Sequence, residues 1–459
     1  MKVLMLGWEF PPHITGGLGT ACHGLTKGLD EVGVEVAFVL PMSVPTGVTR
    51  HVKLRSPANL QPIAPAAATV SQKTVATLME RVSMHRVPAL LQPYATPEMF
   101  NRMVRELLEL RKTHRVDMPM IDWDAISPLT QPVAEPAAPG GTFVPGAGAH
   151  YAGDLMSQVY RYASLAVAIA KRETFDVVHA HDWMTYPAGM AVAAATGKPL
   201  IVHVHSTEFD RSGENVNQQI YDIERAGMHA AACAVCVSHL TRNIALARYG
   251  VPPEKTEVVY NAVELPPDTE VPFNPIRRNE KIVLFLGRLT MQKGPEYFLA
   301  AAKKVVEKYQ RVRFIMAGSG DMVTRLIRMA ADLRIGKYVT FTGFLKGDDV
   351  AKVFRMADLY VMPSVSEPFG ISPLEALSHN VPVIISKQSG VSEVLTHVLK
   401  VDFWDTDEMA NKILAVLRHA PLQRTLRQHG QFELQKLSWR DSAAKLKDIY
   451  SQIVSAADN

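Results

Sequence analysis

Short apolar runs alternate with helix-length segments along almost the whole chain, and this alternation constrains the fold more than any other feature of the sequence. Strands separated by helices pair in parallel, and a parallel sheet is buried by helices on both faces. We expect a first series of strands at 3–7, 34–40, 177–181, 200–205, 234–237 and 257–260, and a second at 282–287, 312–317, 339–341, 359–362 and 381–385. The pattern predicts an α/β chain with two doubly wound halves.

A proline-rich connection separates the two series of strands. Proline lacks a backbone donor and disfavours helix in the residue before it. Four prolines stand close together here, at Pro266, Pro267, Pro272 and Pro275. We therefore place a linker at 264–278 and expect an N-terminal domain at 1–265, a C-terminal domain at 266–435 and a final helix at 436–459.

One stretch, at about 50–150, breaks the alternation because it is rich in proline and alanine. We expect it to be an insertion in the N-terminal domain. Inside it, apolar residues recur at helical spacing and predict an amphipathic helix at 97–112.

The final segment begins with Ser438 and Asp441, which have the spacing of a capping box. Its apolar residues fall on one helical face: Trp439, Ala443, Leu446, Tyr450 and Ile453. A helix with one apolar face must pack on a neighbour, so this helix either closes the C-terminal domain or crosses back to the N-terminal one.

Charge and cysteine content bear on partners and location. The 49 Lys and Arg residues against 45 Asp and Glu give a formal charge of +4, and the basic residues are scattered. This favours anionic small molecules over nucleic acid. Cys22, Cys233 and Cys236 are too few for a secreted disulfide framework. With no leader-like or membrane-spanning apolar run, a cytoplasmic protein without membrane association is expected.

The first expected strand leads into a glycine-rich loop, Gly16-Gly17-Leu18-Gly19, followed by a helix. Glycines at a helix N-terminus let backbone amides approach an anion. The spacing is not GxGxxG, which disfavours a dinucleotide site. A tight turn without a ligand is the alternative.

In the second half, Arg288 and Lys293 follow the strand expected at 282–287. Two cations beside a helix start, at the carboxyl end of a parallel strand, can clamp a pyrophosphate. The alternative is that both are solvated loop charges.

The segment Glu367-Pro-Phe-Gly-Ile-Ser-Pro-Leu-Glu375 carries the most specific local signal. Ser372 and Glu375 have the spacing of a helix cap, which would explain Glu375 without a ligand. Glu367 lies in a loop before the backbone amides of Phe369, Gly370 and Ile371, which could bind substrate oxygens.

Two expected strands end in histidine pairs, His179 with His181 and His203 with His205. Residues two apart on a strand share a face, so the four imidazoles could converge if the strands are neighbours. The pattern does not match a metallo-hydrolase, because Asp182 follows His181 directly. We expect no metal, structural roles for His179 and His203, and site roles for His181 and His205.

The remaining two cysteines, Cys233 and Cys236, lie in an apolar stretch without a second cysteine pair. Small buried thiols are common in such strands, so core packing is expected for both.

These motifs, in this order, resemble those of retaining, nucleotide-sugar-dependent glycosyltransferases of family 4, and more narrowly of glycogen synthase-like members. The resemblance covers nearly the whole chain and is weakest at 50–150. It rests on Gly16-Gly17-Leu-Gly19, His179-Ala-His181-Asp182-Trp183, His205-Ser-Thr-Glu-Phe-Asp210, Gly287-Arg288-Leu-Thr-Met-Gln-Lys293-Gly294 and Glu367-Pro-Phe-Gly-Ile-Ser-Pro-Leu-Glu375. It implies the GT-B architecture, with two Rossmann-like domains facing a central cleft.

The resemblance also implies residue roles. Arg288 and Lys293 would hold the donor diphosphate, together with the loop at Gly17, while Glu375 would hold the ribose. Glu367, with the amides of Phe369, Gly370 and Ile371, would hold the sugar hydroxyls, and His181 would lie over the sugar ring. The acceptor side would include His205, Glu208 and Asp210.

The implied donor is ADP-glucose or UDP-glucose as a co-substrate, without a metal or other cofactor, and the implied acceptor is an α-glucan or a related sugar. One departure bears on this assignment, because Ile14 stands where glycogen synthases usually carry a lysine. The alternatives are a family 4 transferase with a lipid or small-molecule acceptor, a GT-B phosphorylase or epimerase, and a catalytically silent binding protein. The sequence leaves the donor base, the acceptor, the linkage and the oligomeric state open.

Overall fold

The computed structural model describes residues 1–11, 16–41, 82–87, 154–264 and 280–457. The chain forms two compact units. The first comprises Met1–Val204, Asn217–Val235 and Ala443–Asn459, and the second comprises His205–Val216 and Cys236–Ser442. The helix expected at 97–112 lies outside the described residues, as does the expected linker apart from residue 264.

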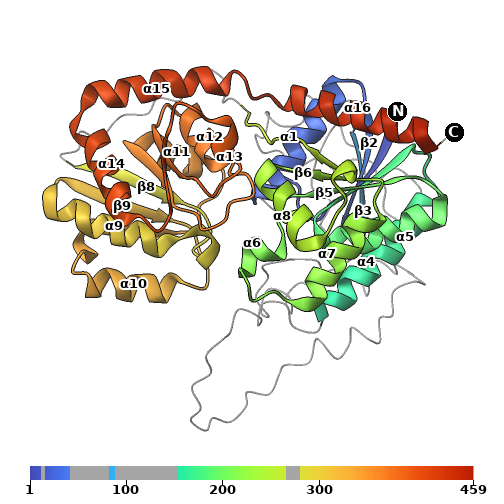
Figure 1. The fold of residues 1–459 in the computed structure, drawn as a ribbon, viewed down its shortest axis with the longest axis horizontal. Coiled ribbons are helices and arrows are strands. Elements are labelled where there is room, and N and C mark those ends of the chain that lie inside the picture. The colour runs from blue at the N-terminus through green and yellow to red at the C-terminus, as the bar shows by residue number, and fades with distance from the viewer. Residues whose placement is uncertain (12–15, 42–81, 88–153, 265–279, 458–459) are drawn as a thin grey trace, which may run out of the picture. The chain divides into compact units, whose positions relative to one another are not determined.

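The N-terminal sheet has seven strands in the order β3-β2-β1-β4-β5-β6-β7. Four of them, β2, β3, β5 and β6, are labelled in Figure 1. Its strands are β1 Lys2–Leu6, β2 Glu35–Pro41, β3 Val82–Val87, β4 Val177–His181, β5 Leu200–Val204, β6 Cys233–Cys236 and β7 Thr256–Val258. The pairs of β1 with β2 and β4, of β2 with β3, and of β4 with β5 are parallel. β4 and β5 are buried along their whole length, as expected of central strands in a parallel sheet.

The helices in this part of the chain are α1 Gly17–Glu31, α4 Asp154–Ala170, α5 Tyr186–Thr196, α6 Glu208–Ser212, α7 Gln218–Ala230 and α8 His239–Tyr249, with 3-10 turns η3 Trp183–Thr185 and η4 Pro253–Lys255. Cys233 and Cys236 are buried and unbridged, which confirms that they pack in the core.

The C-terminal sheet has six strands in the order β10-β9-β8-β11-β12-β13, and all its pairs are parallel. The strands are β8 Lys281–Leu286, β9 Val312–Ala317, β10 Val339–Gly343, β11 Leu359–Met362, β12 Val383–Ser386 and β13 Leu399–Val401. The helices are α9 Pro295–Lys308, α10 Val323–Asp332, α11 Asp348–Met356, α12 Ser372–Ser378, α13 Val391–Val394, α14 Thr406–Arg418 and α15 Ala420–Leu434, with 3-10 turns η5 Met291–Lys293 and η6 Gly336–Tyr338.

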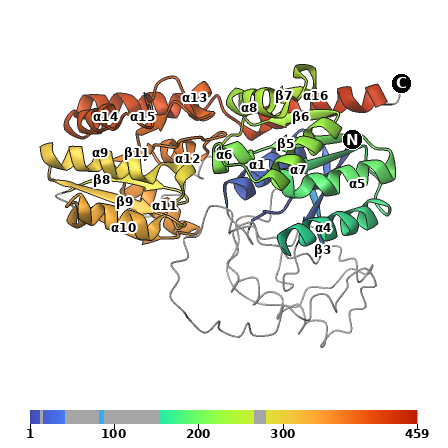
Figure 2. The same ribbon diagram turned by 60° about the horizontal axis from the view of Figure 1, so that its bottom comes forward.

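Helices lie on both faces of the C-terminal sheet (Figure 2). Each face has its own apolar core, because alternate residues of a strand point to opposite faces. Val283 and Phe285 of β8 pack with α9, α10 and α14. Ile282 and Leu284 of the same strand pack with α11 and α12. The expected doubly wound α/β architecture is therefore confirmed.

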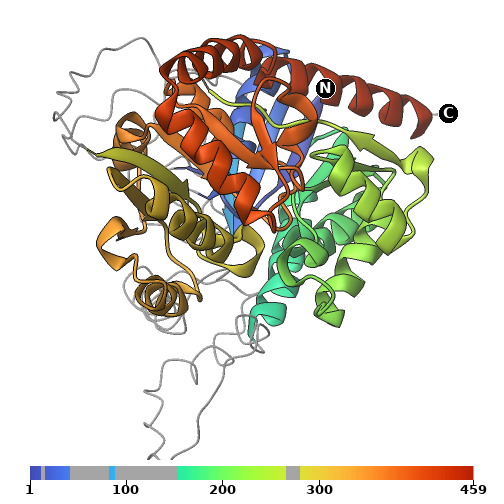
Figure 3. The same ribbon diagram turned by 60° about the vertical axis from the view of Figure 1, so that its left-hand side comes forward.

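The last helix, α16 Trp439–Ala457, starts in the second unit and belongs to the first from Ala443 onward. The Ser438 hydroxyl accepts a hydrogen bond from the amide of Asp441 and donates one to its carboxylate, so the expected cap is present. Within the first unit, Lys447 donates to the carbonyl oxygen of Val32, and the end of α16 runs beside the start of the chain (Figure 3).

The sequence pattern missed two strands, β3 and β13. β3 lies in the stretch dominated by proline and alanine, and β13 has only three residues, so neither shows the apolar run by which the other strands were predicted. Among the described helices, none is long and apolar enough to cross a membrane.

Candidate functional site

In the second unit, the expected cations and Glu367 all follow carboxyl ends of neighbouring strands. Arg288 and Lys293 follow β8, and Glu367 follows β11, which pairs with β8 in parallel. Loops after parallel neighbours lie at the same edge of a sheet, where ligands of open α/β folds bind. The structure thus brings together residues that are far apart in the sequence.

Lys293 is placed by the 3-10 turn η5 and by the glycine that follows it. Gly294 has φ +62°, a left-handed conformation that favours glycine, and directly precedes α9. A Cβ atom at Gly294 would lie 2.1 Å from the carbonyl oxygen of Pro363. The close approach of these two loops therefore requires glycine at this position.

Lys293 and Glu367 form an ion pair. Nζ of Lys293 lies 2.8 Å from Oε1 and 2.6 Å from Oε2 of Glu367. The Ser364 hydroxyl donates a further hydrogen bond of 3.0 Å to Oε2. Arg288 contacts the same loop system through Gln292, whose side-chain oxygen accepts from Nη2 at 3.3 Å.

The loop that carries Glu367 is tied to the loop after β12. The Glu367 amide donates to the carbonyl oxygen of Gln388, and the amides of Gly390 and Val391 donate to Glu367 and Phe369. Within the described residues, the amides of Phe369, Gly370 and Ile371 donate no hydrogen bond. These three donors, at the start of α12, can bind oxygen atoms of a ligand.

The helix cap expected at Ser372 is wrong. α12 does begin at Ser372, but Ile371 precedes it in the capping position and no side chain caps the helix. Ser372 is the first residue of the helix rather than the residue before it, so its hydroxyl is not at the capping position. Glu375 thus has no capping role, and its burial raises its pKa to about 7.

In the first unit, the glycine loop holds a carboxylate that the sequence reading missed. Oε2 of Glu9 accepts a 3.0 Å hydrogen bond from the amide of Gly19, in the first turn of α1. Glu9 is 3% exposed and lies so close to Gly16 that a Cβ atom there would be 2.5 Å from Oε2. Gly17, in contrast, has no atom within 4 Å of its Cβ position. The Glu9 side chain therefore occupies the amide of Gly19, whereas the surroundings of Gly17, the residue expected at the diphosphate, are open.

Three histidines of the first unit lie together on one face of the sheet. His179 and His181 are two residues apart on β4, and His203 on β5 is the register partner of His181. The ring centroids are 4.3 Å apart for His179 and His181, 5.3 Å for His179 and His203, and 5.2 Å for His181 and His203. All three side chains are buried.

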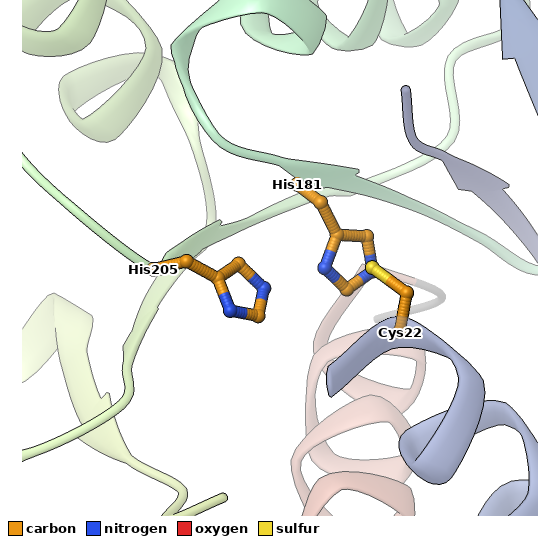
Figure 4. Close-up of side chains that lie close together, drawn as sticks. All are labelled: Cys22, His181 and His205. Carbon is orange, nitrogen blue, oxygen red and sulfur yellow. The ribbon is translucent and has the colours of Figure 1, made fainter. Parts of the chain in front are cut away.

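His181 also lies near Cys22 of α1 (Figure 4). Burial, together with the nearby carboxylates of Glu9 and Asp182, raises the pKa of the Cys22 thiol well above its usual range, so it stays protonated. Burial and the two neighbouring histidines hold the pKa of His181 well below its usual range, and burial lowers that of His203 to about 3. His181 and His203 are therefore neutral near pH 7.

The potential ligand atoms of His179, His181 and His203 lie within 4.8 Å of one another, close enough for a metal ion to be considered. However, the ring of His203 stacks on those of His179 and His181 at angles of 8° and 24°. Because lone pairs of imidazole nitrogens lie in the ring plane, nearly parallel rings direct them along separate planes rather than to one point. The arrangement fits a packed cluster of neutral imidazoles better than a metal centre, and a metal-free site stays our prediction.

The residue after His181 is in a strained conformation. Asp182 has φ +60°, which is uncommon for a residue other than glycine, and it is buried. Its amide donates to the carbonyl oxygen of His203, and the Thr185 hydroxyl donates to that of His181 at 2.8 Å. These bonds fix the backbone where β4 ends.

The expected acceptor-side residues Glu208 and Asp210 have clear local roles. Asp210 and Thr207 form the capping box of α6, and Glu208 accepts from Arg211 at 3.1 Å. Asp210 also accepts a 2.5 Å hydrogen bond from the hydroxyl of Ser366, the residue before Glu367. A role in acceptor binding stays a prediction for both carboxylates and for His205.

Three family models match successive parts of the chain. Residues 2–106 match the starch synthase catalytic domain, residues 130–265 match glycosyltransferase family 4, and residues 268–431 match glycosyl transferases group 1.

Similarity to individual proteins extends over most of the chain. An uncharacterized glycosyltransferase of Methanocaldococcus jannaschii, MJ1607, is 25% identical over 98% of both chains. The glycogen synthase of Mycobacterium tuberculosis is 22% identical over 86% of this chain and 80% of its own.

Two solved structures show the same fold. The sucrose-phosphate synthase of Thermosynechococcus elongatus superposes with a TM-score of 0.69 at 17% identity, covering 99% of each chain. Anabaena Alr3699/HepE, solved with UDP and glucose, gives a TM-score of 0.63 at 17% identity, covering 98% of this chain and 100% of its own. The chain therefore has the GT-B fold and is similar to glycosyltransferases, the glycogen synthase-like members among them.

Proposed function

We propose that this protein transfers glucose, with retention of configuration and without a metal, from ADP-glucose or UDP-glucose to an α-glucan or a related sugar acceptor. The observation that carries the proposal is the ion pair of Lys293 with Glu367 beside three amides that donate no hydrogen bond within the described chain. This arrangement offers cation, anion and backbone donors at one sheet edge. A nucleoside diphosphate sugar needs all three.

In the proposed reaction, the bond between the anomeric carbon and the diphosphate oxygen breaks. A bond from the anomeric carbon to an acceptor hydroxyl oxygen forms, and the hydroxyl proton passes to the leaving phosphate. Negative charge grows on the leaving oxygen, so Arg288 and Lys293 stabilise the transition state more than the ground state.

Other residues would bind and orient the donor. Glu367 and the amides of Phe369, Gly370 and Ile371 would hold the sugar hydroxyls. Glu375, whose pKa burial raises to about 7, would accept hydrogen bonds from the ribose most strongly above that pH.

The first unit would supply His181, whose neutral imidazole can hydrogen-bond the sugar without adding a positive charge. The loop at Gly17 would complete the diphosphate site. His205, Glu208 and Asp210 would serve the acceptor.

The choice of donor is supported by the Anabaena protein solved with UDP and glucose, and the choice of acceptor by the match to the starch synthase catalytic domain. We also propose a cytoplasmic location, since all three cysteines are free.

The test is release of nucleoside diphosphate from ADP-glucose and UDP-glucose, each with and without glycogen or a maltooligosaccharide. Release that requires the glucan supports the proposal and identifies the donor base. Acceptor-independent hydrolysis, or release that requires only a lipid or small-molecule acceptor, would contradict the glucan assignment. No release from either donor would contradict the transferase proposal for both.

Glu367→Gln tests the site within the same assay. We expect turnover to fall at least about 100-fold while nucleotide binding remains, because the sugar loses a charged partner. Asp358→Asn is the matched control, since it also removes one partner of an ion pair, 2.8 Å from Nζ of Lys281, at the opposite end of β8. Turnover of the control should be unchanged.

A further inference from the structure

The last helix of the chain contacts the histidine cluster of the first unit directly. The hydroxyl oxygen of Tyr450, on α16, lies 2.6 Å from Nδ1 of His179. Both side chains are fully buried. The two residues are 271 positions apart, so this contact exists only once α16 has packed on the first unit.

The direction of this hydrogen bond follows from the acid–base character of the two groups. A phenol O–H is more acidic than the N–H of a neutral imidazole, and an imidazole nitrogen is a stronger base than a phenol oxygen, so the phenol is the preferred donor. Within the described residues, the Tyr450 hydroxyl has no hydrogen-bond partner other than His179. Tyr450 therefore donates to Nδ1, and burial raises the pKa of its phenol well above the usual range, so the proton stays on the oxygen.

Acceptance at Nδ1 fixes the tautomer of His179. In a neutral imidazole one nitrogen accepts and the other carries the proton, so the proton of His179 lies on Nε2. A second proton on His179 would have to go to Nδ1, and the Tyr450 hydroxyl would then have to turn from donor to acceptor.

His179 in turn contacts the histidine that we place over the sugar. Its ring centroid is 4.3 Å from that of His181 and 5.3 Å from that of His203. The titratable groups around His179 include His181 and His203 on the strands, Tyr450 on α16 and, beside His181, Cys22 on α1, which has the carboxylates of Glu9 and Asp182 nearby. Burial keeps the first three of these neutral near pH 7, and it keeps Cys22 a thiol.

We propose that Tyr450 and His179 are positioning residues for His181: the Tyr450 hydroxyl holds His179 as the neutral Nε2–H tautomer, and the fixed ring of His179 orients the ring of His181. The functional part of this inference rests on the proposed function, whereas the tautomer does not. A neutral His179 matters for the proposed reaction because the reacting sugar becomes positively charged. Positive charge develops at the anomeric carbon as the diphosphate leaves, and a cationic His179 beside His181 would oppose it.

The test uses Tyr450→Phe in the full-length protein, with Tyr186→Phe as the matched control. Tyr186 is equally buried, belongs to the same unit and donates its hydroxyl to the backbone oxygen of His203 at 3.2 Å, not to an imidazole. Both variants lose one buried hydrogen bond and should lose similar stability, on the order of 1 kcal/mol. Only the first loses the contact to His179.

The first readout needs no turnover. In protein labelled with 15N-histidine, the two-bond nitrogen–proton spectrum distinguishes the tautomers, and the His179 signals are identified by their loss in His179→Gln. We expect the Nε2–H tautomer in the wild type and in Tyr186→Phe, and a mixture of tautomers in Tyr450→Phe. A wild-type His179 that carries its proton on Nδ1 would overturn the proposal, whatever the variants do.

The second readout is steady-state kinetics with the donor that supports release. Tyr450→Phe should lower kcat about three- to tenfold, the equivalent of one hydrogen bond, with the donor KM unchanged. Tyr186→Phe should leave both constants unchanged. Equal losses of kcat in the two variants would show that Tyr450 has only a structural role and would overturn the proposal. If no donor supports release in the wild type, the proposed function fails while the tautomer result still stands.

Discussion

Lys293 and Glu367 neutralise each other across a sequence separation of 74 residues, with Nζ 2.8 Å and 2.6 Å from the two carboxylate oxygens. Both are residues for which we propose separate contacts to the donor, one to the diphosphate and one to the sugar. Donor binding must therefore redistribute this pair. In the protein without bound donor, the ion pair compensates the charge of each residue.

Replacing only one member of this ion pair should lower the free energy of unfolding more than replacing both. Lys293→Met leaves the carboxylate of Glu367, whose side chain is 8% exposed, without its cation. We expect a loss on the order of 3 kcal/mol in the free energy of unfolding. The double variant Lys293→Met/Glu367→Leu should regain most of it, although it stays inactive. Urea unfolding measures both, and a single variant as stable as the wild type would contradict the prediction.

Gly294→Ala should damage both stability and donor binding. The new methyl group would lie 2.1 Å from the carbonyl oxygen of Pro363, so the turn that carries Lys293 must move. Gly250→Ala is the control, because Gly250 has a similar φ of +66° but nothing within 4 Å of its Cβ position. We expect about 1 kcal/mol of backbone strain in the control and clearly more in Gly294→Ala, together with a raised donor KM in Gly294→Ala alone. Equal losses in the two variants would refute the close-contact argument.

Glu375 should make the protein less stable as the pH rises. Its pKa is raised by burial from 4.5 to about 7, so between these values the folded protein holds a proton that the unfolded chain has released. Stability therefore falls as the pH rises through this window, by at most about 3 kcal/mol.

Melting temperatures of Glu375→Gln check this. The variant should gain more over the wild type at pH 8 than at pH 5, because its side chain cannot ionise. Glu307→Gln changes an exposed carboxylate of α9 and should show no such difference. A gain for Glu375→Gln that does not depend on pH would contradict the assigned cause.

His203 should make the first unit sensitive to acid. Burial lowers the pKa of His203 from 6.5 to about 3. Between these pH values the unfolded chain therefore binds a proton at His203, whereas the folded protein does not. The contribution of neutral His203 to the free energy of unfolding is thus complete above pH 6.5 and is lost as the pH falls toward 3. At pH 5 the loss should reach about 2 kcal/mol.

Unfolding free energies at pH 7 and pH 5 test this prediction. His203→Gln should lose less stability than the wild type between the two values. His429→Gln, a change at an exposed ring of α15, should behave as the wild type does. The same change in stability for His203→Gln and the wild type between the two pH values would contradict the prediction.

Periodicity and local spacing predicted much of this fold. The strands at 177–181, 312–317 and 359–362 have the predicted bounds, because fully buried parallel strands are continuous apolar runs. The cap at Ser438 was predicted correctly, since both of its groups are local. The cap at Ser372 was not, because the helix begins at Ser372, one residue earlier than the spacing predicted.

For the candidate site too, some contacts could be predicted from the sequence and others could not. The order of the motifs placed Arg288, Lys293 and Glu367 after strands, and strand ends in a parallel sheet share an edge, so their proximity could be predicted. No pattern indicated that Glu9 would occupy the first turn of α1.

The sequence by itself determined the α/β class, the run of strands and helices, and the residue types that each strand end carries, because these depend on neighbours within a few positions. The tertiary structure alone decided that Lys293 pairs with Glu367 and that Tyr450 bonds to His179. Such contacts join residues 74 and 271 positions apart, and they depend on how whole elements pack. Packing is set by the shape and burial of many side chains together, which local periodicity does not encode.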